Sequence, residues 1–149
     1  MSEQGLQLLR TADAQISELI ELFSGREDGV LARPCTERAR LADGTVGVVA
    51  WHTADNYRRI ASFLNNQPDS GHPDARSAKD VTIPALQQLL TSSRESFARL
   101  DELSEERLNA VPAASAMRFC DGERTLQQVV RSLLVHQAHN VDTLKAAAS

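Results

Sequence analysis

The sequence predicts an all-α fold, a four-helix bundle with long crossover loops. Four stretches carry apolar residues at three- and four-residue spacing, and no stretch alternates apolar and polar residues for more than a few positions. Segments rich in turn-forming residues separate these stretches, and long connections of that kind occur in helical bundles. The chain has 149 residues, the size of one domain with a single core, so residues 1–149 are expected to form one domain.

The first helix is expected over about residues 4–23. Its apolar residues share one side, and Gly25 follows them as a stop signal. Residues 24–44 include Gly29, Pro34 and Gly44, so this segment is predicted to be a long connection without a regular element.

The second helix is expected to begin after Thr45, a good N-cap, and to run to about Asn65. Residues 65–80 are polar and rich in turn formers, which predicts an exposed loop with a solvated His72. The third helix is introduced by Thr82 and is expected to end near Leu103.

A short helical turn is expected at residues 105–108, and the last helix follows it. Thr125 and Gln128 have the spacing of a capping box, in which each side chain bonds the backbone of the other residue. The last helix is therefore expected over about residues 126–147.

Composition and charge exclude several classes of partner. The net charge of −4 argues against nucleic-acid binding, and no run of eighteen apolar residues predicts a membrane span. The N-terminal segment lacks an export-type apolar run, and Cys35 and Cys120 stand outside any CxxC spacing, which favours reduced thiols. The chain is expected to be cytoplasmic.

The last helix places His136 and Asn140 on or near its inward face. In a helical projection centred on Leu133, Asn140 falls among the apolar residues, His136 lies about 60° from the centre, and His139 lies about 120° away. His139 is therefore expected near solvent.

The second helix gives a similar picture. In a projection centred on Val49, Asn56, Ile60 and Phe63 fall near the centre and His52 about 60° to one side. Two inward histidines on separate helices require hydrogen-bond partners or a metal to offset the cost of burial.

The flanks of the second helix are expected to be less buried. Asp55 and Arg59 suit a solvated flank, and Trp51 and Tyr57, which fall away from the middle of the apolar stripe, are expected to cover the bundle.

Two segments resemble known motifs of one superfamily. TVGVVAWHTADNYRRI resembles the second-helix motif of DinB-like proteins, with His52 at the position of the first metal ligand. RTLQQVVRSLLVHQAHNVDTL resembles their last-helix motif, in which two histidines stand four residues apart. His136 matches the first of these histidines, and Asn140 stands where the second belongs.

The resemblance to the DinB-like superfamily, which includes thiol-dependent transferases and maleylpyruvate isomerase-type bundles, implies a function. Such proteins are four-helix bundles, often dimeric, that bind zinc, nickel or another divalent metal through three histidines. Several use a low-molecular-weight thiol such as mycothiol or bacillithiol. The resemblance thus implies a small-molecule substrate, a homodimer, a thiol cosubstrate and a divalent metal, the last weakened or lost through Asn140, because a neutral amide is a weak ligand for zinc or nickel.

Three hypotheses follow for the site. In the first, a weakened metal site of His52 and His136, with Asn140 or His139 as third ligand, serves thiol transfer or hydrolysis. In the second, His52 or His136 is a general acid or base without metal, and Asn140 orients the substrate or stabilises developing negative charge. In the third, the chain is a non-catalytic binder of small molecules or a stress-related interaction module, with Asn140 hydrogen-bonded to the two imidazoles as a polar core network. Asn56 and Arg59 are the candidate cofactor-binding residues.

Overall fold

A computed structural model of the protein describes residues 2–38, 40–68, 73–100 and 103–149, and these ranges are all-helical apart from loops and one isolated bridge, as expected. The α-helices are α1 (Glu3–Phe23), α2 (Val46–Leu64), α3 (Ile83–Ala98), α4 (Glu105–Asn109) and α5 (Leu126–Ala148). Short 3-10 helices lie between them: η1 (Asp28–Ala32), η2 (Thr36–Arg38) and η3 (Ala78–Asp80).

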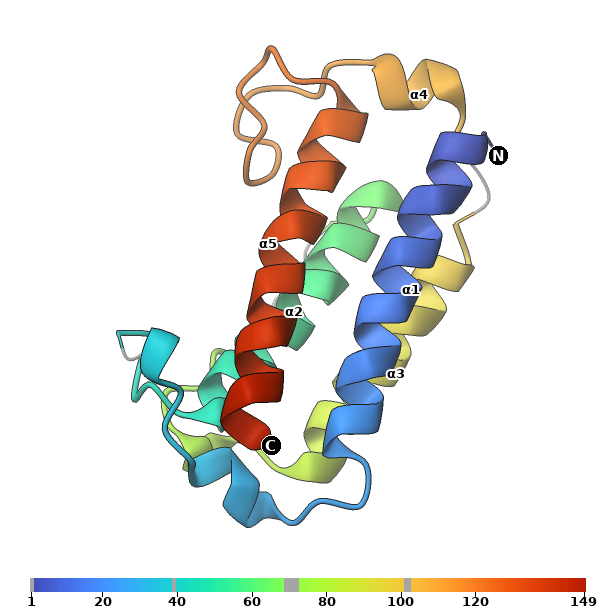
Figure 1. Ribbon diagram of the computed structural model, residues 1–149. Helices are drawn as coiled ribbons and strands as arrows, with labels where there is room; N and C mark the ends of the chain where they lie inside the picture. The colour runs from blue at the N-terminus through green and yellow to red at the C-terminus, as the bar shows by residue number, and fades with distance from the viewer. Residues whose placement is uncertain (1, 39, 69–72, 101–102) are drawn as a thin grey trace.

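The long helices pack side by side around one apolar core. Both α1 and α2 pack against α3 and α5, so α1 and α2 lie diagonally opposite each other. Figure 1 shows α1 and α5 running in one direction, α2 and α3 in the other, and α4 across the end where α5 begins. Because α2 and α3 point the same way, the connection between them returns along the length of the molecule.

The predicted helix starts are confirmed by their caps. The Thr45 hydroxyl accepts a bond from the Val48 N–H, and the Thr82 hydroxyl accepts one from the Ala85 N–H. Thr125 and Gln128 form both bonds of the predicted capping box. These side chains occupy N–H groups that the first turn of a helix leaves without a partner.

One predicted helix end and one predicted irregular connection differ from the structure. The third helix ends at Ala98 rather than near Leu103: the Leu100 N–H bonds the Phe97 carbonyl, three residues back, so the α-helical pattern does not continue. Leu100 and Leu103 are nevertheless buried. The connection 24–44, expected to be irregular, contains η1 and η2. His72 lies outside the described residues.

The buried face of α2 is wider than predicted. Tyr57, expected as a cover, has no exposed surface, and Asp55, expected on a solvated flank, is only 4% exposed. Asn56 and Phe63, predicted near the centre of the face, are only partly buried. The reason is that α3, α5 and η1 all pack against α2, so more than one stripe of it is covered.

At one end of the molecule α1 touches the segment after α3. A Cβ built on Gly5 would lie 2.6 Å from the carbonyl oxygen of Leu103, and the Ser2 hydroxyl donates to that oxygen at 2.8 Å. The absence of a side chain at residue 5 is therefore what lets the two backbones meet.

No helix in the described ranges has both the length and the apolarity that crossing a membrane requires.

Candidate functional site

A chain of amide hydrogen bonds joins α2 to α5 at the level of His52. The Gln137 Nε2 donates to the backbone carbonyl of Thr53 at 2.8 Å, which leaves its Oε1 to accept from Asn56 Nδ2 at 3.3 Å. The same Asn56 nitrogen lies 3.3 Å from His52 Nε2. Because a backbone carbonyl can only accept, it fixes the orientation of both amides and makes the His52 Nε2 an acceptor.

His52 is consequently a neutral imidazole with its proton on Nδ1. Burial lowers the pKa of His52 below its ordinary value of 6.5, and the positive charges of Arg59 and Arg38 lower it further, against the opposing charges of Asp55 and Asp74. The Nε2 lone pair of this neutral imidazole is engaged by the Asn56 amide, so His52 can act as a general base only where Asn56 gives up that bond.

His136, on α5, is also held neutral. Its Nε2 lies 3.4 Å from Arg118 Nη1, and a guanidinium can only donate, so this nitrogen accepts. Burial lowers the pKa of His136, and the charges of Arg118 and Arg38 act in the same direction. His52 is close enough for its charge to act on His136 as well.

The loop before α5 brings Arg118 to this histidine. The Ser115 N–H donates to the Cys120 carbonyl at 2.9 Å, and Cys120 is buried, which anchors the loop. The Arg118 guanidinium lies over the Phe119 ring, 5.0 Å from its centre.

Asn140 is 1% exposed, and its side-chain oxygen accepts a hydrogen bond from the Arg38 guanidinium. Arg38 ends η2, within a loop closed by the hydrogen bonds Cys35 N to Gly44 O, 2.7 Å, and Val46 N to Arg33 O, 2.9 Å. The position at which the superfamily resemblance expects a third histidine thus holds a buried amide bound to a cation.

A second side chain ties the same loop to α5 one turn further along. Thr143 Oγ1 donates to Glu37 Oε2 at 3.0 Å, so adjacent residues of η2 are bound to Thr143 and Asn140. His139 Nε2 lies 4.0 Å from the same Glu37 oxygen, and the His139 side chain is 65% exposed. His139 is near solvent, as its position on the helix predicted.

The donor set does not fit a divalent metal. The Nε2 atoms of His52 and His136 and the Oδ1 of Asn140 each accept from an N–H donor, and two of those donors are guanidinium cations. Within the described ranges, no three His, Cys, Asp or Glu side chains gather as a metal site requires. A divalent cation here would face two positive charges where its ligands should lie.

The structure brings four of the sequence-predicted site residues to the contact between α2 and α5: His52, Asn56, His136 and Asn140. Arg59 lies at the edge of the site, with its Nε 3.0 Å from Asp55 Oδ2.

Sequence reasoning missed three functional residues, Gln137, Arg38 and Arg118. Helical spacing could have indicated Gln137, which follows Leu133 by four residues and so shares its inward face. No sequence signal placed the two arginines, because each comes from a loop.

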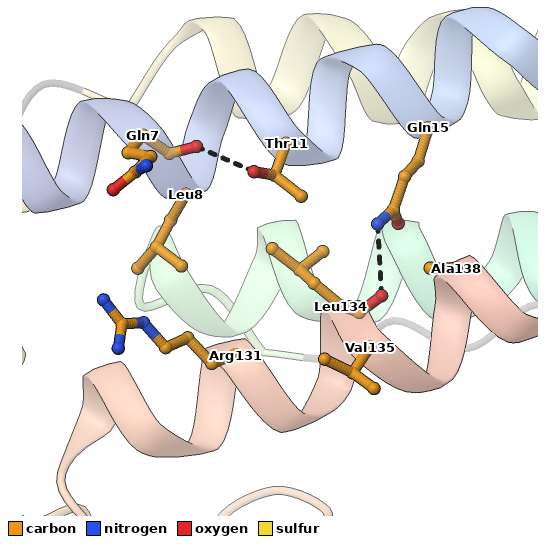
Figure 2. Close-up of a pocket in the computed structure, with 8 residues that line it drawn as sticks. All are labelled: Gln7, Leu8, Thr11, Gln15, Arg131, Leu134, Val135 and Ala138. Carbon is orange, nitrogen blue, oxygen red and sulfur yellow. Dashed lines mark hydrogen bonds between the residues drawn. The ribbon is translucent and has the colours of Figure 1, made fainter.

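Two hollows flank α5 and α2. A cavity of about 340 Å³ lies beside His52, between α2 and the loops 41–42 and 74–76. A groove of about 370 Å³ lies between α1 and α5, on the other side of α5 (Figure 2). The Gln15 side chain in this groove donates to the Leu134 carbonyl at 3.1 Å and accepts from the buried Tyr57 hydroxyl at 2.6 Å.

Comparison of the chain with models of protein families, with curated proteins and with solved structures gives no match.

Proposed function

We propose that the chain is a DinB-like four-helix bundle whose site between α2 and α5 binds a small organic anion without a metal and uses His52 as a general base. The observation that carries this proposal is the Arg38 guanidinium bound to Asn140, the position at which the resemblance expects a metal ligand. Replacing a ligand by an amide and adding a cation converts a site for cations into one for anions.

The charges around the two histidines support an anionic substrate. The charge of Arg38 lowers the pKa of both imidazoles. Arg118 lies at hydrogen-bond distance from His136, and the charge of Arg59 lowers the pKa of His52. Guanidinium groups bind carboxylates and phosphates through paired N–H groups, so the arginines supply the positive charge for an anion while both imidazoles are neutral.

The role of His52 follows from its protonation state and its position. Its imidazole is neutral, is partly buried and borders the cavity of about 340 Å³. Its Nε2 would take a proton from a water, thiol or substrate held there by exchanging the weak bond from Asn56, 3.3 Å long, for that proton. The arginines would hold the anionic group of the substrate and stabilise negative charge that develops as the proton leaves. A low-molecular-weight thiol and a homodimer stay predictions from the sequence resemblance.

Titration of the imidazole resonances with acetate and with phosphate, followed by NMR, tests the binding step. A bound anion favours the imidazolium, so the pKa of His52 and of His136 should rise in metal-free protein. The variant Arg38→Gln should weaken anion binding at least tenfold, whereas Arg10→Gln, on the exposed side of α1, should leave it unchanged. Unshifted histidines at saturating anion would overturn the proposal.

Metal analysis of protein purified without chelator tests whether the site works without a metal. The proposal predicts substoichiometric zinc and nickel, and no perturbation of the histidine resonances when either metal is added. One equivalent of bound zinc that perturbs His52 and His136 together would favour the weakened metal site instead.

Hydrolysis of an anionic activated ester, p-nitrophenyl succinate, tests the general base. Wild-type protein should hydrolyse it with saturation, and His52→Gln should lose this rate while still binding acetate. Anion binding without any such turnover would favour the non-catalytic binder, which the existing bond from Asn56 to His52 Nε2 also suits.

A further inference from the structure

The groove between α1 and α5 shares no residue with the site of the proposed function. Its volume of about 370 Å³ falls within the range of ligand pockets, roughly 300–1,000 Å³. Along α1 its lining runs from Gln7 to Gln15, so at a rise of about 1.5 Å per residue the groove extends for about 12 Å. A groove of this shape suits an extended molecule.

The floor of the groove is apolar, and an exposed apolar side chain lies at its edge. Leu8 and Leu134, which Figure 2 shows between the two helices, are buried and belong to the core. Val135, on α5, is 71% exposed, more than any other large apolar side chain in the described ranges. An occupant with an apolar body would remove this surface from water, which favours its binding.

The two ends of the groove differ in the polar groups that they offer. Figure 2 shows Arg131 and Gln7 at one end and Gln15 at the other. Gln15 accepts from the Tyr57 hydroxyl at 2.6 Å and donates to the Leu134 carbonyl at 3.1 Å, so its amide is already engaged by the protein. A charged group of a ligand therefore finds its partner at the Arg131 end.

Arg131 is a cation without a counter-charge in the groove. In the part of the chain that the structure describes, its guanidinium forms no ion pair and no hydrogen bond, and no acidic side chain lines the groove. The side-chain amide of Gln7 has no hydrogen-bond partner there either. A guanidinium binds a carboxylate through two parallel N–H groups, so this end of the groove is complementary to an organic acid.

We propose that the groove binds a carboxylic acid with an unbranched apolar chain, its carboxylate on Arg131 and its chain along Leu134 and Val135 toward Gln15. The charge of Arg131 selects the head group, and the length and apolar floor of the groove select the tail. A short acid lacks the chain and an alkyl amine carries the wrong charge, so both are discriminated against. This binding site is separate from the histidines and goes beyond the proposed function.

Octanoate is the probe, and its contacts are measured by NMR on methyl-labelled protein. Intermolecular nuclear Overhauser effects should connect its chain to the methyl groups of Leu134 and Val135, and the shifts of these methyl groups should saturate. Octylamine should bind at least tenfold more weakly, and acetate should leave both residues unperturbed. Octanoate that contacts neither residue, or that binds no better than octylamine, would overturn the inference.

Two variants separate the head group from the tail. Arg131→Gln removes the cation and should weaken octanoate at least tenfold, and Val135→Asp, which places a carboxylate at the apolar edge, should do the same. Both side chains are exposed, so neither change should affect folding. Arg99→Gln, an exposed arginine outside the groove, is the matched control. Wild-type octanoate affinity in both groove variants would contradict the inference.

A second copy of the chain is the alternative occupant of the groove, and sedimentation tests it. A dimer that Val135→Asp converts to a monomer, and that octanoate does not dissociate, would overturn the inference. The histidine site is tested apart from the groove: Arg38→Gln, which should weaken acetate, should leave the octanoate affinity measured at Val135 unchanged. A parallel loss of both would show that octanoate acts through the histidine site and not through the groove.

Discussion

At the scale of single residues, Gln137 sets the chemistry of a histidine that it does not touch. Its amide is oriented by the Thr53 carbonyl, it orients Asn56 in turn, and Asn56 determines which nitrogen of His52 carries the proton. Gln137 is 1% exposed, so water cannot replace these bonds if they are lost.

Replacing Gln137 by Leu should therefore destabilise the fold and alter His52. The loss of a buried donor and acceptor should cost about 1–3 kcal/mol of unfolding free energy, measured by urea denaturation. The His52 imidazole should lose its preference for the Nδ1–H tautomer, measured by nitrogen chemical shifts. Gln4→Leu, on the exposed side of α1, should change neither quantity.

The two histidines make stability depend on pH. The pKa of His52 and of His136 is lower in the folded protein than the ordinary value of 6.5, so below that value the unfolded chain binds more protons. Stability should be constant above about pH 7.5 and should fall as pH decreases through 6.5.

Urea denaturation across this range checks the effect. The double variant His52→Gln with His136→Gln should show a smaller loss of stability between neutral and mildly acidic pH than the wild type. His139→Gln, on the exposed flank of α5, should lose as much stability at mildly acidic pH as the wild type. If the double variant showed the same dependence of unfolding free energy on pH as the wild type, the two histidines would not be its cause.

Restoring the expected third histidine tests why a metal does not fit. Asn140→His alone should bind zinc weakly, because the Arg38 cation still faces the site. Adding Arg38→Gln should raise the zinc affinity at least tenfold, measured by competition with a chromogenic chelator. Equal affinities of the single and double variants would show that Arg38 is not the obstacle.

At the scale of elements, the sequence predicted the helices well and their contacts less well. Capping residues such as Thr45 and Thr125 act locally, so α2 and α5 begin where the sequence indicates. Which side of α2 is covered depends on its neighbours, and in the folded chain Tyr57 and Asp55, which periodicity alone left on the flanks, are buried.

The residues of the candidate site were also predicted only in part. Helical spacing placed Asn140 inward and His139 outward, and applied to Gln137 it gives the correct answer too. Arg38 and Arg118 reach the site through the tertiary course of their loops, which no local pattern encodes. The sequence therefore yielded the acceptors of the site and one donor, Asn56, but not the two arginine donors, Arg38 and Arg118.

The hydrogen bond from the buried Tyr57 hydroxyl to Gln15 links α2 to α1 and is expected to contribute to stability. The variant Tyr57→Phe keeps the ring and removes the hydroxyl, which leaves the Gln15 oxygen without this donor. The loss should be about 1–2 kcal/mol in urea denaturation. In the background Gln15→Leu the same substitution should cost clearly less, since its partner is already absent.

At the scale of the whole molecule, the contact of α1 with the segment after α3 fixes one end of the structure. Gly5→Ala should destabilise the protein by about 1–3 kcal/mol, although alanine favours helices, because the added methyl group collides with backbone and side chain of Leu103. Gly29→Ala, with open space around it, should be near neutral. Thermal denaturation of both variants checks the contrast.

The amide chain between α2 and α5 joins residues that are far apart in sequence: Asn56 and Gln137 are separated by 81 positions. During synthesis α2 is made before α5, so His52 and Asn56 are hydrated until Gln137 on α5 is available. The site therefore forms only when α5 docks against α2. Amide protons around Gln137 should accordingly exchange with solvent only when the whole domain opens.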